Sequence, residues 1–240
     1  MSGFGLHVIV CSSQSLGSSL CWQPTMTTIH ETAPATKGLV LHRAVGYDLL
    51  VWLLTHGRTR AFRTRMVDLA RLGTGESVLD VGCGTGSLAI EAKRYVGNQG
   101  HVSGIDASPE MIVRAMSKAA KALVDVSFRT AVVEALPFAD ATFDMVLSTL
   151  MLHHLPRKVR EQCLKEVRRV LKPEGRVLVV DFGTPQDKSG FLAHFHRHGH
   201  VDRRQIVSLL DEAGFHSIDQ GAVGVSSLQF VLAKTSAERR

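Results

Sequence analysis

The chain has 240 residues, 45% of them hydrophobic, and this size predicts one domain with its own buried core plus an appendage. The formal net charge is +6, but the basic residues are scattered over expected helices and interleaved with acidic ones. Such a pattern is typical of solvated helix faces, so no nucleic-acid partner is expected, whereas peripheral contact with an acidic membrane surface or binding of an anionic substrate stays open. The longest apolar run near the start, residues 49–54, is far shorter than the about 20 residues that span a bilayer.

The first 38 residues are rich in Ser and Thr, and Lys37 is their only Lys or Arg. They lack the basic segment of a secretory signal and the arginines of a mitochondrial transit peptide. We therefore expect a disordered extension at residues 1–38, with Met26 as a candidate start. The four cysteines show no C-x-x-C spacing and no pairing pattern, which indicates a reducing, cytoplasmic location.

Two helices are expected after this extension, over residues 39–56 and 59–72, because Gly57 and Gly73 act as stop signals. The first helix contains a nearly continuous apolar stretch from Tyr47 to Leu54. We interpret the pair as a helical cover that packs on the following domain. Alternatively, the apolar stretch would form a surface that contacts an apolar acceptor or a membrane.

From residue 77 onward, short apolar strands alternate with helices. The expected strands are residues 77–81, 102–106, 126–130, 145–149 and 177–181, and the helices between them are 87–95, 109–122 and 157–171. The tail adds a helix at 203–213 and strands at 217–219 and 228–233. This alternation predicts an α/β fold with a parallel sheet that is covered on both faces.

A glycine-rich turn follows the first of these strands, in the text VLDVGCGTGSLAI at residues 78–90. Its glycines allow a tight turn and let a ligand approach the backbone without meeting a Cβ atom. A dinucleotide site would read G-x-G-x-x-G and seat a pyrophosphate on the next helix. Here the spacing is G-x-G-x-G, and Asp80 precedes the turn, where its carboxylate would repel a pyrophosphate and attract a cation. The loop therefore favours a positively charged nucleoside over NAD, with a plain strand-to-helix turn as the alternative.

Asp106 ends the second strand about 20 residues after the glycines, where a carboxylate can accept hydrogen bonds from both hydroxyls of a ribose. A solvent-exposed carboxylate at a strand end is the simpler interpretation. The combination of Asp106 with the glycine loop favours the nucleoside site.

Four ordered segments, VLDVGCGTG, VSGIDASPEMI, EALPFADATFDMVLSTLMLHHLP and EVRRVLKPEGRVLVVDFG, lie within residues 75–183. Together they resemble the motifs of class I S-adenosylmethionine-dependent methyltransferases, in the branch that includes the ubiquinone and menaquinone biosynthesis C-methyltransferases. The resemblance implies an enzyme that uses S-adenosyl-L-methionine to methylate a small-molecule acceptor, with a hydrophobic quinol or phenol as one candidate. The expected assembly is a monomer or homodimer.

The same resemblance implies a Rossmann-like, seven-stranded, mostly parallel sheet with helices on both faces and the last strand antiparallel. Residues 39–240 would form the methyltransferase domain. Within it, 39–74 would be the helical cap, 75–183 the cofactor-binding core, and 184–240 a lid segment with the C-terminal helix and strands.

The resemblance further implies which residues bind the cofactor. The glycine loop with the preceding carboxylate would hold the methionine end, the second strand would bind the ribose, the next two loops would border the adenine, and the fourth strand would end under the methyl group. In that order the implied set is Asp80, Gly82, Cys83, Gly84, Gly86, Asp106, Ala107, Met111, Val133, Glu134 and Ser148.

One position departs from the family pattern. Val132 stands where members often carry an Asp that accepts a hydrogen bond from the adenine amino group. Losing one such bond costs about 1 kcal/mol. Weaker cofactor binding is therefore expected, and loss of binding is not.

Two groups of histidines remain. His153 and His154 follow the fourth strand and are candidates for a catalytic base, with a role in shaping the loop before Pro156 as the alternative. The text HFHRHGH places His194, His196, His198 and His200 at every other position. Metal binding, substrate contact and a polar lid are all open for this second group. We favour the lid and assign no metal ligand.

Two other function classes compete with small-molecule methyl transfer. Methylation of nucleic acid or protein is one, although the text after the fourth strand lacks the Asn/Asp-Pro-Pro-aromatic motif of amino-group DNA methyltransferases. A non-catalytic S-adenosylmethionine-binding module is the other, and no degraded motif favours it.

Overall fold

A seven-stranded sheet organises the main part of the chain in the order β5-β4-β3-β6-β7-β9-β8. The computed structural model describes residues 8–9, 26–27, 59–183, 201–224 and 228–236. The chain divides into two compact units, residues 1–33 and 34–240. In the first unit, β1 (Val8–Ile9) and β2 (Met26–Thr27) pair antiparallel. All other elements belong to the second unit.

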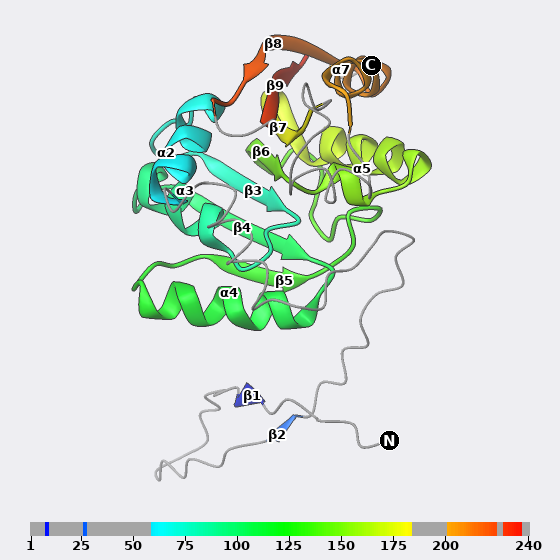
Figure 1. The fold of residues 1–240 in the computed structure, drawn as a ribbon. Helices are drawn as coiled ribbons and strands as arrows, with labels where there is room; N and C mark the ends of the chain where they lie inside the picture. The colour runs from blue at the N-terminus through cyan, green and yellow to red at the C-terminus, as the bar shows by residue number, and fades with distance from the viewer. Residues whose placement is uncertain (1–7, 10–25, 28–58, 184–200, 225–227, 237–240) are drawn as a thin grey trace, which may run out of the picture. The chain divides into compact units, whose positions relative to one another are not determined.

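The sheet is parallel through its first five strands and antiparallel at the far edge (Figure 1). The parallel strands are β3 (Ser77–Val81), β4 (His101–Asp106), β5 (Ser127–Thr130), β6 (Phe143–Thr149) and β7 (Leu171–Phe182). The last strand of the chain, β9 (Leu228–Thr235), pairs antiparallel with both β7 and β8 (Phe215–Ala222). The fold class expected from the sequence is thereby confirmed, with the last strand antiparallel.

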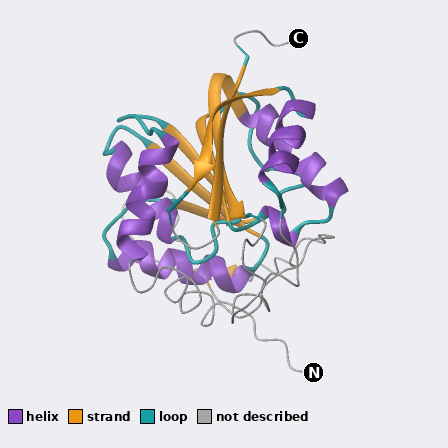
Figure 2. Cartoon of the chain, turned by 45° about the horizontal axis from the view of Figure 1, so that its top comes forward, coloured by secondary structure: helices purple, strands orange, loops and turns teal. Residues whose placement is uncertain are grey.

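Helices cover both faces of this sheet (Figure 2). Alternate strand residues separate the core into two clusters, as the two-residue period of a strand requires. One cluster packs against α2 (Thr59–Ala70), α3 (Ser87–Val96) and α4 (Pro109–Lys121). The other packs against α5 (Arg157–Val170) and α7 (Arg203–Glu212). The central strands β3 and β6 are buried on both sides, which explains their nearly continuous apolar sequences, whereas the edge strand β5 is partly exposed.

The helix boundaries follow local capping rules. Ser108 caps α4, because its hydroxyl accepts the backbone amide of Met111, and Pro109 occupies the first turn. Gly86 precedes α3 in the left-handed conformation, so this helix begins directly at the glycine loop without a side-chain cap. These two helix starts lie next to the ends of β3 and β4.

Within the described residues, the expected elements agree with the structure except at some ends. The fifth parallel strand was expected at residues 177–181, but β7 begins at Leu171, which pairs with Phe143 of β6 before an irregularity at residues 172–175, and the ladder resumes at Arg176. The Lys-Pro-Glu-Gly sequence of residues 172–175 is typical of a turn, so the sequence gives no sign that the strand begins before it. β8 also exceeds the expected residues 217–219, since its pairing with β9 continues from Phe215 to Ala222.

Two expected segments lie outside the described residues: the first helix of the cover, at 39–56, and the lid with its four histidines, at 184–200. The second helix of the cover is α2, which packs by Phe62, Met66 and Val67 into the core. Within the described ranges, no helix combines the length and apolar character needed to cross a membrane.

Candidate functional site

The residues expected at the site meet at the edge of the sheet where β3, β4, β6 and β7 end. The parallel register places Asp80 beside Gly104 of β4 and Leu147 of β6. Carboxyl ends of parallel strands are where ligands bind in open α/β sheets, particularly where the strand order reverses. In this sheet β4 and β5 follow β3 toward one edge, whereas β6 lies on the other side of β3. The strand order therefore reverses between β3 and β6.

The glycine loop has the backbone conformation that only glycine adopts readily. Gly82, Gly84 and Gly86 have φ angles of 68°, 52° and 74°. A Cβ atom at Gly86 would lie 2.6 Å from the ring of Phe128 and 2.8 Å from Ala115, so this glycine allows α3 to pack closely. At Gly82 a Cβ atom would collide with the side chain of Met151. The loop is therefore fixed by packing as well as by turn geometry.

Asp106 connects the glycine loop to the start of α4. One carboxylate oxygen accepts the backbone amide of Gly84 and the other accepts that of Ser108, each at 2.9 Å. Burial raises the pKa of this carboxyl, and the two amide hydrogen bonds oppose that rise. Each oxygen retains a second lone pair, so the carboxylate can accept further hydrogen bonds from a ligand.

Asp80 is a buried carboxyl group, 2% exposed, that lies on β3 one residue before the strand ends at Val81 and the glycines begin. Burial and the neighbouring charge of Asp106 raise its pKa to about 8, with partial relief from the backbone amide of Ala89. Its Oδ2 atom has no hydrogen-bond partner within the described residues. An unpartnered buried carboxyl oxygen is costly, which indicates that a cationic or donor group completes this site.

Lys118 ties α4 to the same loop. Its ammonium donates hydrogen bonds to the hydroxyls of Thr85 at 2.7 Å and Ser87 at 3.0 Å. Cys83 points into the packed side of the loop, where burial and the charges of Asp80 and Asp106 raise its thiol pKa. The thiol is therefore held in its protonated form and serves as an apolar side chain.

Ala107 and Met111, expected beside the adenine, lie in and directly after the turn from β4 to α4. Met111 is 2% exposed and Ala107 is half-buried. Val133 is buried in the core, and Glu134 is half-buried and follows it in the segment between β5 and β6. That segment begins beside Asp106, whose carbonyl accepts the amide of Ala131 at 3.0 Å.

Ser148, expected under the methyl group, lies on β6 beside Val81 at the end of β3. The side chain is 3% exposed, and its hydroxyl has no hydrogen-bond partner in the described part of the chain. The hydroxyl of Thr149, the next residue, is also buried and unpartnered there. Like Asp80, these groups indicate a ligand that supplies polar atoms at this edge.

His153 forms a close pair with Asp181, which lies at the end of β7. Its Nδ1 atom is 2.6 Å from Oδ1 of Asp181, and its backbone amide donates to Oδ2 at 3.0 Å. The carboxylate also accepts the amide of Phe182 and is fully buried. A carboxylate at Nδ1 favours the tautomer in which Nε2 is free to accept a proton. This is the arrangement of an oriented histidine base.

His154 differs from its neighbour. The two rings are 3.8 Å apart, but Nδ1 of His154 is buried without a hydrogen-bond partner among the described groups. Burial, reinforced by His153, lowers its pKa to about 4. His154 is therefore neutral at physiological pH and is a weak proton acceptor, so the structure separates two histidines that the sequence treats alike.

Sequence reasoning missed Asp181 and Lys118 as parts of the site. Asp181 carries a recognisable signal, since it follows an apolar run near the end of a strand, as Asp80 and Asp106 do. Its pairing with His153 depends on the register of β6 and β7, which no local pattern reveals. Lys118 lies 33 residues from Thr85 and has no motif of its own.

Comparison with known proteins gives consistent matches. A family model described as a methyltransferase domain matches residues 78–175. A ubiquinone/menaquinone biosynthesis C-methyltransferase of Klebsiella pneumoniae is 30% identical over 205 residues, covering 73% of this chain and 80% of that protein. The protein of the same description from Bdellovibrio bacteriovorus is 36% identical over 140 residues, covering 58% of each chain.

Solved structures share the fold at lower identity. A SAM-dependent methyltransferase of Aquifex aeolicus has a TM-score of 0.67 at 23% identity, covering 80% of this chain and 98% of that one. The [4+2]-cyclase SpnF has a TM-score of 0.66 at 18% identity, covering 85% of this chain and all of that one, 100%. Because the second protein is named for a different reaction, the fold alone does not assign the chemistry.

Proposed function

This chain belongs to the class I S-adenosylmethionine-dependent methyltransferases, and we propose that it transfers the methyl group to a hydrophobic quinol or phenol. Its cofactor is S-adenosyl-L-methionine and its acceptor is a small molecule. The names of the relatives in ubiquinone and menaquinone biosynthesis support a quinol-like acceptor. The observation that carries the cofactor site is the buried, unpartnered carboxyl oxygen of Asp80 at the head of the glycine loop.

The side chains at this edge fit the cofactor. Asp80 offers a carboxyl group to the cationic methionine end, and Asp106 has lone pairs available for the ribose hydroxyls. The glycine loop permits close approach of the backbone, and Val133 with Glu134 would border the adenine. Ser148 would lie near the reacting methyl group with its hydroxyl available.

The chemistry needs little more than alignment. The bound cofactor supplies an activated sulfonium methyl group, and the protein has to hold a nucleophile in line with it and exclude water. Such positioning can supply on the order of 7 to 11 kcal/mol. Among the chain's own residues, the glycine loop and Asp106 orient the donor, whereas the segment after β6 would orient the acceptor.

His153 is the proposed base. Asp181 holds its Nδ1, so Nε2 would take the proton of the acceptor hydroxyl as the acceptor forms its bond to the methyl carbon. The carbon–sulfur bond breaks in the same displacement, and its electrons remain on sulfur as a neutral thioether. The proton then leaves His153 for solvent. His154 packs against this ring and would shape the pocket without taking the proton.

Further assignments are proposals of the same kind. A cytoplasmic location is supported by Cys83 and Cys163, both of which are free thiols. Three further points remain predictions: the division of the chain at residues 38, 74 and 183, peripheral membrane contact, and a monomeric or homodimeric state. Size-exclusion chromatography with light scattering measures the last of these directly.

A labelled-methyl transfer assay tests the proposed function. The protein is incubated with methyl-labelled S-adenosylmethionine and either a short-chain quinol, a phenol, an oligonucleotide or a protein mixture. We expect label in the quinol or phenol fraction only. Label confined to the oligonucleotide or the protein fraction would contradict the proposal.

The raised pKa of Asp80 predicts that cofactor binding depends on pH. Below the pKa of about 8 the carboxyl is mostly protonated, whereas the cationic cofactor favours its ionised form. Binding should therefore release about one proton near neutral pH, and affinity should rise up to about pH 8 and then level off.

Calorimetry in buffers of different ionisation enthalpy counts the released protons. Asp80→Asn is the matched control, because it keeps the shape and cannot ionise. Equal proton release in the wild type and in this variant would show that another group is responsible.

A further inference from the structure

The segment of residues 131–142 links β5 to β6 with turns only and carries the proposed adenine border at Val133 and Glu134. Its beginning is attached to Asp106 through the amide of Ala131. Ala131, Val133 and Leu136 are buried in the core cluster that contains α5. Apolar burial is non-directional, so these contacts fix the depth of the segment but not its position along the helix.

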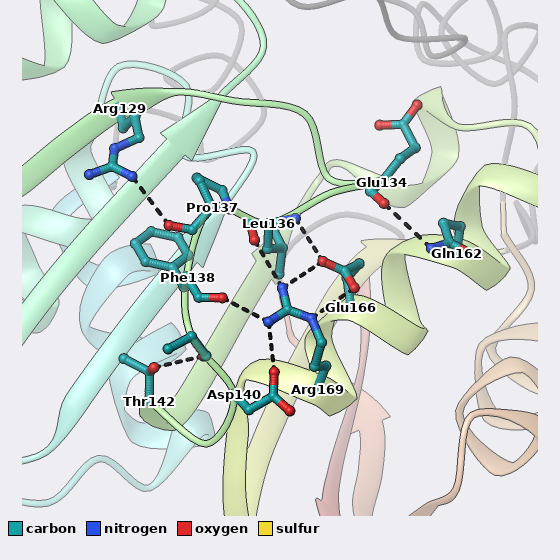
Figure 3. Close-up of polar contacts among 11 residues, drawn as sticks. Arg129, Glu134, Leu136, Pro137, Phe138, Asp140, Thr142, Gln162, Glu166 and Arg169 are labelled. Carbon is teal, nitrogen blue, oxygen red and sulfur yellow. Dashed lines mark hydrogen bonds and ion pairs between the residues drawn. The ribbon is translucent and has the colours of Figure 1, made fainter.

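Arg169, in the last turn of α5, supplies the directional contacts (Figure 3). Its Nη2 donates to the carbonyl of Leu136 at 2.9 Å and its Nη1 to the carbonyl of Phe138 at 2.7 Å. Nε and Nη2 also donate to the two carboxylate oxygens of Glu166, at 2.9 and 2.7 Å, and Nη1 donates to Asp140 at 3.0 Å. All three guanidinium nitrogens are thus engaged.

Glu166 completes the attachment from the same helix. Its Oε2 accepts the backbone amide of Leu136 at 2.8 Å, so the ion pair holds both backbone polar groups of this one residue. The pair is largely shielded, with the side chains 31% and 15% exposed for Arg169 and Glu166. Hydrogen bonding to Arg169 lowers the pKa of Glu166, so the carboxylate is ionised and the pair is charged.

Residues 132–135 are therefore held at both ends, by Asp106 before them and by the Arg169–Glu166 pair after them. Glu134 lies between these attachments in the chain, and its carbonyl accepts the side-chain amide of Gln162 of α5 at 3.5 Å (Figure 3). We propose that Arg169 and Glu166 are positioning residues for the cofactor, which hold Val133 and Glu134 at the place where adenine is recognised. This rests on the proposed function of the site.

The proposal predicts a loss of affinity that is specific to the adenine part of the ligand. Arg169→Ala should weaken binding of S-adenosylhomocysteine about tenfold, which corresponds to about 1.4 kcal/mol. Binding of S-ribosylhomocysteine, which lacks the adenine, should change by less than about twofold. Arg169→Lys should restore little, since an ammonium group cannot reproduce the planar fork.

Calorimetry with both ligands makes this measurement on the full chain. The matched control is Arg157→Ala, on the same helix, whose Arg–Glu pair with Glu161 is exposed and touches no part of the segment in question. Glu166→Gln keeps an acceptor for the Leu136 amide and serves as the second variant if Arg169→Ala does not fold. It should weaken S-adenosylhomocysteine binding by about threefold.

The outcomes separate the two proposals. Equal weakening of both ligands, or unchanged affinity for S-adenosylhomocysteine in the folded Arg169 and Glu166 variants, would overturn the positioning role alone. Failure of the wild-type protein to bind S-adenosylhomocysteine would overturn the proposed cofactor site, and the positioning role with it.

Discussion

Replacing Asp106 by alanine should weaken the binding of S-adenosylhomocysteine by about 100-fold or more, because hydrogen bonds to a charged group contribute about 1.5–3 kcal/mol each. The variant would lose the proposed acceptor for two ribose hydroxyls. It also frees the amides of Gly84 and Ser108, which this carboxylate holds at 2.9 Å. The glycine loop would therefore lose its attachment to α4 together with its ligand contact. Calorimetric titration of the purified variant measures the effect.

Asp125→Ala is the control for this experiment, since Asp125 is an exposed carboxylate near the opposite end of the neighbouring strand β5. Its affinity for S-adenosylhomocysteine should equal that of the wild type. A retained affinity in Asp106→Ala, with thermal unfolding showing a folded protein, would remove Asp106 from the cofactor site.

Replacing His153 by asparagine should lower kcat by about 10²- to 10⁴-fold, the usual contribution of a general base. Asparagine places a nitrogen donor close to the position of Nδ1, so the buried carboxylate of Asp181 keeps a partner while the atom that takes the proton is lost. An alanine variant would instead leave that carboxylate poorly paired, which is strongly destabilising. The acceptor found in the labelled-methyl assay provides the substrate.

The affinity for S-adenosylhomocysteine should stay unchanged in His153→Asn, which distinguishes a loss of chemistry from a loss of cofactor binding. His154→Asn should retain most of the rate, because burial already keeps His154 neutral, with a pKa of about 4. A rate in His153→Asn within about threefold of the wild type would assign both histidines to the structure of the loop.

The sequence predicts well those features that local patterns encode. Asp106 ends β4 and Asp80 lies one residue before the end of β3, each next to a turn, so their place at one edge follows from the alternation of strands and helices. The glycine spacing and the start of α4 at Ser108 and Pro109 are likewise local signals. These features locate the proposed cofactor side of the site.

Contacts between distant segments could not be predicted in this way. Asp181 meets His153 only because β6 and β7 pair in a particular register, and the two partners are 28 positions apart in the sequence. Lys118 reaches the glycine loop, and Arg169 reaches the segment before β6, across helix faces that look like ordinary solvated surfaces in the sequence. Their functions depend on tertiary packing, which composition and periodicity do not encode.

The different environments of His153 and His154 show the same limit within two adjacent residues. Both lie in the same short segment after β6. The ring of His153 is hydrogen-bonded to a buried carboxylate, whereas Nδ1 of His154 has no hydrogen-bond partner in the described structure. The partner of a side chain determines its protonation, and the sequence does not name that partner. The proposed roles of base and pocket wall therefore follow from the structure alone.

The most direct test of the central claim is calorimetric titration of the purified protein with S-adenosylmethionine, S-adenosylhomocysteine and NAD in turn. We expect both sulfur ligands to bind with one-to-one stoichiometry, to compete with each other, and to lose affinity in Asp80→Asn and Asp106→Ala. NAD should give no binding heat. Binding of NAD without binding of either sulfur ligand would contradict the assignment of the glycine loop and its two carboxylates.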